Sequence, residues 1–343
     1  MNYNGKNICN HPFSNIEVDR MGHVHCCCRF HLPAIFGNIY ENSFEEVWNS
    51  ETAQKIRNNI MNEDYSLCNK NTCVYINNKN FDPRLDIAEE DILAKMKKYP
   101  KYVSFCHDKE CNLACIICRD EIWRNTEEEL EKLNSQIETK FLPMLKDAEY
   151  VSISANGDPI ASRHSRLLIK RIHETYPNIK FEIFTNGTLL DENNLKSLGI
   201  LDNLYSVKMS IHSAHKETYA KIIRNGELYY DKLMKNIQYI SELRKKYNFD
   251  MLLLFVTTSL NYRDIPDFIR FSDSLNANCY ISEYSDAQLQ SSQKHPEWVI
   301  VDKNHPEYKE LVKVLQDDVF KEKTNFNLSG ILSQIQREGV AKE

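Results

Sequence analysis

Three cysteines, Cys111, Cys115 and Cys118, lie close together in the stretch ECNLACIICRD. Thiolates suit zinc ions and iron–sulfur clusters, and four of them complete either kind of site. Three thiolates leave one metal position free, where a small ligand can bind. A structural zinc site completed by Cys106 or His107 is the alternative that the spacing alone leaves open.

The composition limits the partners of the chain. The 343 residues carry a formal net charge of -6 and a pI near 6.0, which argues against general nucleic-acid binding. No apolar stretch approaches the ~20 residues of a membrane helix, and no signal peptide is recognisable, so we expect a cytoplasmic protein without membrane contact. In a reducing compartment, the 11 cysteines indicate metal binding rather than a disulfide scaffold.

Alternating strands and helices must position the cysteine loop. From about residue 102, short apolar strands alternate with amphipathic helices, a pattern typical of a parallel sheet with crossover helices. The strands are expected at 102–106, 150–155, 181–185, 204–211, 251–258 and 279–284. Two well-signalled helices are expected at 126–145, which opens with Thr126 and Glu129 at capping-box spacing, and at 231–247.

These elements predict an α/β fold, a partial (β/α)6 TIM-like barrel, because a closed barrel needs eight strands. Its working face should lie at the carboxyl ends of the strands. Four segments are expected: a small cysteine-rich domain over 1–80, a helical linker over 81–101, the barrel over 102–285 and a tail over 286–343. In the tail, residues 305–320 read as one amphipathic helix, followed by a polar segment that covers a sheet edge.

The cysteine spacing and three further motifs, in order along the chain, resemble the radical S-adenosylmethionine (SAM) superfamily. The CxxxCxxC motif is followed by NGDP (156–159) after the second strand, where that family has GGEP, and by TNG (185–187) after the third. The segment SVKMSIHSAHKETYAKIIRNG is similar to the fourth strand and its helix. Two departures are Ile117, where an aromatic residue is usual, and His212, where the family often has aspartate.

The resemblance implies a [4Fe–4S] cluster on Cys111, Cys115 and Cys118, with SAM at the free iron. It further implies that the backbone of Asn156 and Gly157 approaches the methionyl amino group, assisted by Asp158. The other implied SAM contacts are the carboxylate with Thr188 and Arg224 and the ribose with Ser210. The alternatives from the residues alone are a helix cap for Thr188 and a solvated position for Arg224.

Substrate-side residues are less clearly marked. Polar side chains at alternate strand positions predict a pocket lining, namely the pairs Ser152 with Ser154, Lys208 with Ser210 and Thr257 with Ser259. The alternative is that they are outward-facing residues of strands whose register is misjudged. Glu283 is a candidate acid or base, with a surface carboxylate as its alternative. Cys279, and with it Cys106, is a candidate hydrogen-atom donor, as cysteines are in radical epimerases of the family, although lone strand cysteines are more often packing residues.

The N-terminal cysteines resemble a SPASM or twitch domain, which holds auxiliary clusters in radical SAM enzymes. The similarity rests on the Cys9, Gly22 and Cys27 spacing and on the segment GNIYENSFEEVWNSETAQKIRNNI. In most relatives this domain follows the barrel, whereas here it precedes it. The resemblance implies one auxiliary [4Fe–4S] cluster on four cysteines, namely Cys9, Cys27, Cys68 and Cys73. Cys26 or Cys28 can replace Cys27, and structural zinc at the same cysteines is the alternative.

Together, these features predict a radical SAM maturase that abstracts hydrogen from a peptide. A dehydrogenase or epimerase acting on a carbohydrate or nucleotide sugar is the second hypothesis, and a non-catalytic zinc-binding adaptor is the third. The resemblance also implies an electron donor such as flavodoxin or ferredoxin. The substrate and the bond that is broken cannot be read from the sequence.

Overall fold

The computed structural model describes residues 2–3, 5–29, 31–70, 73, 75–76, 85–86, 99–153, 156–285, 294–323 and 325–340. The chain divides into two compact units, which are described separately. The first contains residues 1–110 and 125–182, and the second contains residues 111–124 and 183–343. Strand β8 (Lys180–Thr185) contributes to both, because the division falls between Glu182 and Ile183.

The N-terminal part of the first unit is built from short elements. They are the strands β1 (Asn2–Tyr3), β2 (Lys6–Asn7), β3 (Asn15–Asp19), β4 (His23–His25) and β5 (Gly37–Asn38), and the helices α1 (His11–Ser14), α2 (Phe44–Trp48) and α3 (Glu51–Met61). Ser43 caps the start of α2, where the side chains of Ser43 and Glu46 form a reciprocal capping box. Ser50 caps α3 by accepting a hydrogen bond from the backbone N–H of Ala53.

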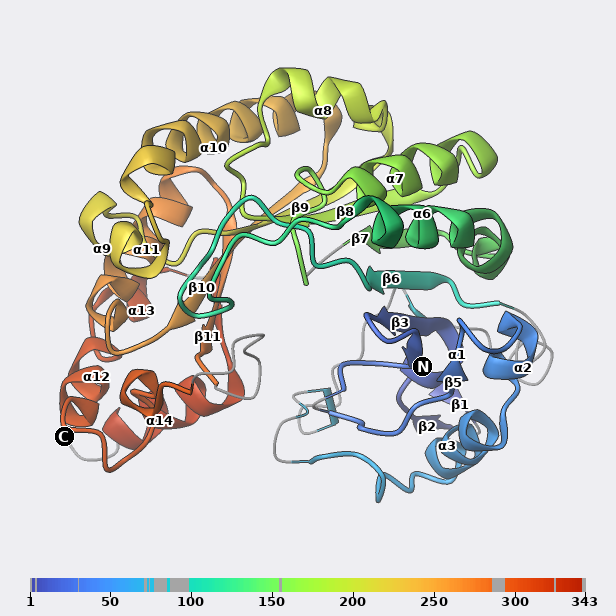
Figure 1. Ribbon diagram of the computed structural model, residues 1–343. Coiled ribbons are helices and arrows are strands. Elements are labelled where there is room, and N and C mark those ends of the chain that lie inside the picture. Colours follow the sequence, from blue (N-terminus) through green and yellow to red (C-terminus); the bar gives the residue numbers. More distant parts are fainter. Residues whose placement is uncertain are drawn as a thin grey trace. The chain divides into compact units, whose positions relative to one another are not determined.

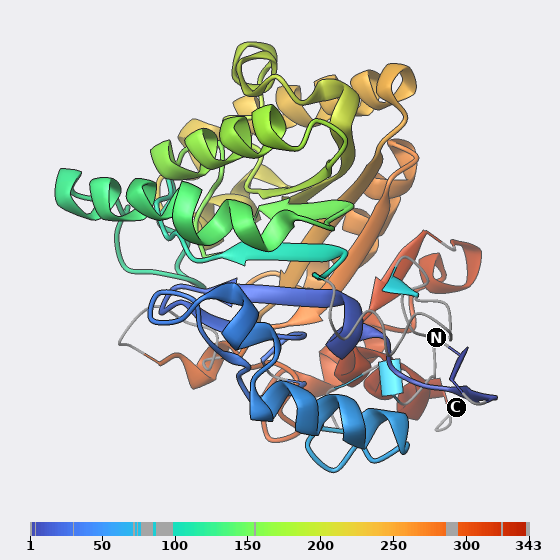
Figure 2. The same ribbon diagram turned by 90° about the vertical axis from the view of Figure 1, so that its right-hand side faces the viewer.

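The remainder of the first unit consists of βα elements. They are β6 (Tyr102–Cys106), α6 (Glu127–Gln136), the π-helix η2 (Ile137–Phe141), the 3-10 helix η3 (Leu142–Leu145), β7 (Tyr150–Ile153) and α7 (Arg163–Thr175). The strand order in this unit is β8-β7-β6-β3-β4-β5. Strands β3 and β6 pair in parallel and run side by side in both views (Figures 1 and 2), from Asn15 opposite Tyr102 to Asp19 opposite Cys106.

The second unit has the strand order β12-β11-β10-β9-β8. Its strands after β8 are β9 (Leu204–Ser210), β10 (Asp250–Thr257), β11 (Asn278–Glu283) and β12 (Phe326–Leu328). The crossover helices lie along one side of these strands (Figure 1): α8 (Glu192–Leu198), α9 (Lys216–Ile222), α10 (Glu227–Tyr247) and α11 (Ile265–Ser274). Phe255 of β10 contacts Phe268 of α11, which identifies the helix-facing side of the sheet.

The other elements of the second unit are short or lie in the tail. They are the 3-10 helices η4 (Leu201–Asn203), η5 (Tyr262–Asp264) and η7 (Pro296–Trp298), and the helices α12 (Tyr308–Val314), α13 (Val319–Glu322) and α14 (Gly330–Val340). Among the residues that the structure describes, no helix combines the length and apolar character needed to cross a bilayer.

The predicted α/β class with a large parallel sheet is confirmed, and all six expected strands are present within one or two residues of their predicted ends over the described residues. The expectation of one helix over 305–320 is wrong, because α12 ends at Val314 and α13 starts at Val319. The tail also supplies β12, which pairs in parallel with β11 and thus covers that sheet edge. Most of the predicted linker over 81–101 lies outside the described residues.

Candidate metal centres

The loop with Cys111, Cys115 and Cys118 belongs to the second unit and is anchored by its backbone. The N–H groups of Cys118 and Arg119 both donate to the carbonyl of Cys115 at 2.9 Å, which closes a tight turn around the last two cysteines. The N–H of Ile116 donates to the carbonyl of Ile222 at 2.9 Å, so the loop is fixed to the end of α9.

The three thiols lie near enough to one another for their charges to interact. Burial raises the pKa of Cys115 well above its ordinary value, and Cys118 and Cys111 raise it further. Burial lowers the pKa of Arg119, but Cys118 and Cys111 outweigh this effect and the net shift is upward. Thiolates crowded in this way are stabilised by a bound cation, and this donor set therefore fits a metal or an iron–sulfur cluster.

Polar side chains connect the cysteine loop to the TNG turn after β8. Asn112 Nδ2 donates to Thr188 Oγ1 at 2.9 Å, and Asn186 Nδ2 donates to Asn112 Oδ1 at 3.0 Å. Thr188 Oγ1 donates in turn to Asn186 Oδ1 at 2.6 Å. Asn186 Nδ2 also lies 3.8 Å from Cys111 Sγ, while the N–H of Leu113 lies 3.5 Å from the same sulfur. Two donors thus point at the Cys111 sulfur, an arrangement that stabilises a thiolate ligand.

The TNG turn is itself held from α10. Asn236 Nδ2 donates to the carbonyls of Gly187 and Thr188, at 2.9 and 3.1 Å. Gly187 has a φ of 77°, and a Cβ there would lie 2.8 Å from Leu233 Cδ1, so this position favours glycine. Thr188 is fully buried within this network, and the cap of α8 is supplied by Asp191.

The NGDP residues lie in the first unit, packed on the segment that leads to Cys111. A Cβ on Gly157 would lie 2.3 Å from the carbonyl oxygen of Glu110. The N–H of Asp158 donates to that same oxygen at 2.8 Å. The buried Asp158 carboxylate accepts from the N–H groups of Ile160 and Ala161 at 3.0 Å each. Asn156 Nδ2 donates to the carbonyl of Cys106. The motif therefore secures the end of β6 against the end of β7.

The other residues implied for SAM binding have varied surroundings. Ser210 is half-buried at the end of β9, opposite Leu254 of β10. Arg224 is exposed, and its backbone N–H lies 3.3 Å from the carbonyl of Ala114 in the cysteine loop. Ile117 is buried. His212, at the other departure from the family pattern, has a φ of 65° and accepts a hydrogen bond at Nδ1 from the N–H of Val256. A positive φ at a histidine is sparsely populated and marks a conformation that the surroundings impose.

The substrate-side candidates divide between the two faces of the sheet. Lys208 and Ser210 lie on the less buried face of β9. Thr257 lies on the same side of β10 as Phe255, which faces α11, so the pairing of Thr257 with Ser259 as pocket lining is wrong. Of the third pair, Ser152 is buried on β7, and Ser154 lies outside the described residues.

Cys279, the candidate hydrogen-atom donor, is fully buried against Ser272 of α11, and burial raises the pKa of its thiol to about 11. Glu283 accepts a hydrogen bond from Ser329 Oγ. The catalytic roles of both remain predictions that these positions do not favour. His107 contacts His164 through their Nε2 atoms at 2.8 Å, and Cys106 Sγ lies 3.5 Å from Ser104 Oγ. His107 and Cys106 are the two candidate fourth ligands of the alternative zinc site, and these are their contacts in the structure.

The N-terminal cysteines converge on one cavity in the first unit. Its lining includes the four predicted ligands, Cys9, Cys27, Cys68 and Cys73, together with Cys26. Burial raises the pKa of Cys9, and Cys27, Cys73 and Cys68 raise it further. Cys28 is not among the lining residues. The four-cysteine set that includes Cys27 therefore fits a closed four-ligand site.

A buried arginine stands beside this cavity. The Arg57 side chain is fully buried, donates from Nε to the carbonyl of Pro12 and from Nη1 to that of Trp48, and lies 4.1 Å from the Trp48 ring. Its Nη2 has no hydrogen-bond partner among the described residues. Burial lowers the pKa of Arg57 to about 10, and Cys26 opposes this shift. Ile60, one turn further along α3, lines the cysteine cavity. A buried cation of this kind requires a nearby negative charge, which a thiolate-ligated cluster supplies.

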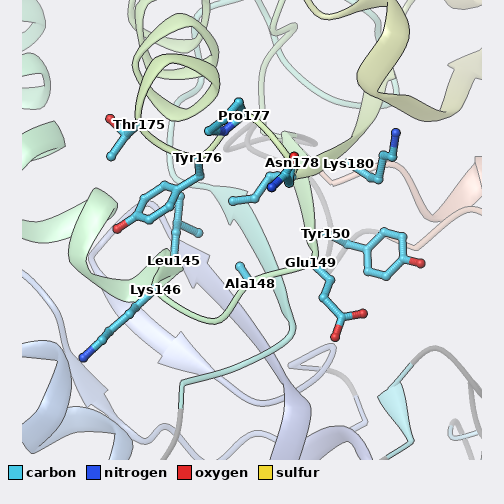
Figure 3. Close-up of a pocket in the computed structure, with 11 residues that line it drawn as sticks. Leu145, Lys146, Ala148, Glu149, Tyr150, Thr175, Tyr176, Pro177, Asn178 and Lys180 are labelled. Carbon is cyan, nitrogen blue, oxygen red and sulfur yellow. The ribbon is translucent and has the colours of Figure 1, made fainter.

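A separate hollow of about 470 Å³ lies at the amino ends of β7 and β8 (Figure 3). Its walls come from the two loops 145–150 and 175–180, with Tyr176 and Pro177 on one loop and Glu149 and Tyr150 on the other. None of the predicted site residues lines it. It lies at the end of the strands opposite the NGDP motif, and parallel α/β sheets bind their ligands at the carboxyl ends.

Four site residues were missed by the sequence reasoning: Asn112, Arg119, Asn236 and Arg57. Asn112 and Arg119 each adjoin a cysteine of the motif, and this adjacency was the signal available for them. Asn236 and Arg57 lie inside helices among ordinary polar residues, and only the fold places them near the sites.

Comparison with known families gives two matches. Residues 105–271 match the model of the radical SAM superfamily, and residues 9–74 match that of SPASM, an iron–sulfur cluster-binding domain. A search of curated proteins found no significant match.

Among solved structures, SuiB from Streptococcus suis bound to S-adenosylmethionine aligns over 94% of this chain and 72% of its own, with 15% identity and a TM-score of 0.44. Native anSMEcpe with bound AdoMet aligns over 66% of this chain and 63% of its own, with 18% identity and a TM-score of 0.45. Methylornithine synthase (PylB) aligns over 69% and 68%, with 13% identity and a TM-score of 0.42. The chain thus covers less than two thirds of the anSMEcpe chain.

Proposed function

This chain belongs to the radical SAM superfamily and carries a SPASM domain before its radical SAM domain, and we propose that it is a maturase that abstracts hydrogen from a peptide. The observation that carries the catalytic part is the loop of Cys111, Cys115 and Cys118 tied to the TNG turn through Asn112, Asn186 and Thr188. When bound, the [4Fe–4S] cluster and SAM supply reductive cleavage of the sulfonium and a 5′-deoxyadenosyl radical.

The protein residues have separate tasks in this proposal. Cys111, Cys115 and Cys118 hold the cluster, and the donors on Asn186 and Leu113 stabilise the Cys111 thiolate. The backbone at Asn156 and Gly157 receives the SAM amino group in this proposal, while Ser210 reaches the ribose. Arg224 is suited to the SAM carboxylate because its guanidinium is exposed and its backbone adjoins the cysteine loop.

Two of the implied SAM contacts act through other groups. The Asp158 carboxylate is buried, and its Oδ1 already accepts hydrogen bonds from two backbone N–H groups of its own turn. Thr188 Oγ1 is occupied by Asn112 and Asn186. We therefore assign both residues the role of shaping the loops that contact SAM.

The SPASM domain holds an auxiliary iron–sulfur cluster, which we assign to Cys9, Cys27, Cys68 and Cys73. Four protein ligands favour electron relay or structural support over direct binding of substrate. An external one-electron donor of the flavodoxin or ferredoxin type is required, and we place the protein in the cytoplasm, where such donors and free thiols coexist.

Anaerobic reconstitution with iron and sulfide tests this proposal. We expect about eight irons per chain and reductant-dependent formation of 5′-deoxyadenosine. Replacement of Cys111, Cys115 and Cys118 by alanine should remove about half of the iron and all SAM cleavage. Cys27→Ala should lose the other half, whereas Cys28→Ala, the matched control beside it, should retain both clusters. Zinc in place of iron, without SAM cleavage, would establish the zinc-binding adaptor instead.

The substrate class needs a separate experiment. Peptides lead because SPASM-bearing members of the family are dominated by peptide and protein maturases. A dehydrogenase or epimerase acting on a carbohydrate or nucleotide sugar is the competing candidate. Incubation of the reconstituted enzyme with the peptides and sugars encoded or made by the neighbouring genes, in deuterated buffer, separates them by mass spectrometry. A mass change in a sugar alone would refute the peptide assignment.

A further inference from the structure

The hairpin of β3 and β4 carries a second set of metal-binding side chains that the function above does not use. Asp19 ends β3, and His23 and His25 lie two positions apart on β4. Glu17 stands opposite His25 in the antiparallel register. Strand alternation therefore puts Glu17, Asp19, His23 and His25 on one face of the hairpin.

The turn between the strands holds the Asp19 carboxylate in a fixed orientation. Its Oδ1 accepts from the N–H groups of Met21 at 2.8 Å and His23 at 3.0 Å. Gly22 completes the turn with a φ of 81° and donates its N–H to the Asp19 carbonyl. Because Oδ1 is occupied by the backbone, Oδ2 is left to face the two imidazoles.

Asp19 Oδ2 lies 3.2 Å from His23 Nδ1 and 3.4 Å from His25 Nε2, and all three atoms lie within 4.8 Å of one another. A tetrahedral zinc ion with bonds of about 2.0 Å separates its ligand atoms by roughly 3.3 Å. A hydrogen bond explains the 3.2 Å distance to His23, but the 3.4 Å distance to His25 exceeds the usual N–H···O range of about 2.7 to 3.2 Å. We propose that Asp19, His23 and His25 bind a divalent ion of the zinc class.

Three protein ligands leave one position of the ion open. The side chains of His25 and Asp19 are 5% and 13% exposed, whereas that of His23 is 36% exposed, so the ion has a protein side and a solvent side. His25 Nδ1 is buried and has no hydrogen-bond partner among the described residues. Glu17, directly opposite, is the carboxylate placed to receive that N–H once the ring binds metal through Nε2.

The helix η2 covers the face of the sheet opposite to this hairpin face. Phe105 contacts Phe141 of η2 on the covered face, so Ser104 and Cys106 point to the other. In the parallel register of β3 with β6, Asp19 is opposite Cys106. The open coordination position thus lies at the carboxyl end of the strands, where a substrate donor can replace water.

Zinc binding should be measured on the iron-reconstituted protein, because its clusters then occupy the cysteines that would otherwise take zinc. After desalting, we expect about one zinc per chain by mass spectrometry. His23→Gln and Asp19→Asn should each weaken zinc binding by at least about tenfold. Loss of a residue that only supports a metal ligand already weakens metal binding by about that much, and these residues are ligands themselves. The Asp19→Asn change keeps the Oδ1 contacts of the turn, and unchanged iron content verifies that the domain is folded.

His215→Gln is the matched control, because His215 Nε2 pairs with Asp267 at 3.0 Å without a second histidine, and it should not change zinc binding. Cobalt in the same site should give d–d absorption without thiolate charge transfer. Zinc-free wild-type protein, equal zinc in the wild type and His23→Gln, or a cobalt–thiolate band would each overturn the proposal. None of these results depends on SAM cleavage, so the maturase proposal is tested separately.

Discussion

Gly157→Ala tests whether the NGDP glycine is required by packing within the protein. The new Cβ would lie 2.3 Å from Glu110 O, 2.8 Å from Lys109 C and 2.9 Å from Glu110 N. Carbon atoms approach non-bonded neighbours to about 3.5 Å, so the Glu110 backbone would have to move by roughly 1 Å. All three neighbours are backbone atoms, which no side-chain rotation can displace.

The expected cost is about 3 kcal/mol. Overpacking a filled interior costs about 1 to 3 kcal/mol, and loss of the hydrogen bond from the Asp158 N–H to Glu110 O adds about 1 kcal/mol. In a chain of 343 residues, such a change should lower the melting temperature by roughly 4 °C. Since Glu110 immediately precedes Cys111, iron bound at the three-cysteine loop should also decrease.

Urea unfolding of the metal-free protein and iron analysis after reconstitution measure the two effects. Gly37→Ala is the matched control, because its Cβ would approach most closely the Val47 side chain, at 3.1 Å, which can shift, while the Val47 Cα lies at an ordinary contact distance of 3.6 Å. This control should cost less than about 1 kcal/mol. If both variants unfold at the same urea concentration, the packing argument fails and the glycine must be explained by SAM approach alone.

Two further predictions concern buried charge. Arg57→Met should lower the reduction potential of the auxiliary cluster, because it removes a buried positive charge beside the cysteine cavity. Redox titration followed by electron paramagnetic resonance measures the shift. An unchanged potential would mean that Arg57 only supports the backbone of Pro12 and Trp48. Burial lowers the pKa of His164 to about 4, which Asp108 opposes, while unfolded histidine titrates near 6.5. The folded protein therefore disfavours the charged ring. The free energy of unfolding is unaffected by this residue above pH 6.5 and decreases as pH falls toward 4, by roughly 2 kcal/mol at pH 5. His164→Gln should unfold in urea with less difference between pH 7 and pH 5, and an unaltered pH profile would contradict the assignment.

The central strands could be predicted because buried parallel strands leave apolar runs that loops and helices do not imitate. Residues 102–106 and 150–153 are examples, with Val103, Phe105 and Val151 all buried. The cysteine motifs could be predicted equally well from the sequence, since the cysteines of each motif are close together in it. The network of Asn112, Asn186 and Thr188 was not, because its members are up to 76 positions apart and carry no periodicity.

The tail shows why a correct period can still give a wrong helix. Leu311, Leu315 and Val319 are all buried at helical spacing, so the apolar pattern continues across the break. The break is made by Asp317, whose Oδ1 accepts from the N–H of Val319 at 2.9 Å and starts a new helix. A short acidic side chain competes with the helical hydrogen bond there, an effect that hydrophobic periodicity does not record.

The pairing of β3 with β6 changes how the domain order should be understood. The two family matches end and begin at residues 74 and 105, as for two separate domains. Yet β3 joins β6 through five register pairs, and residues 1–110 form one compact unit with 125–182. A SPASM domain that precedes the barrel can thus place a strand on the edge of β6 that the partial barrel leaves unpaired. Because exposed strand edges promote association, a fragment beginning at residue 102 should aggregate, although the family match lies wholly within it.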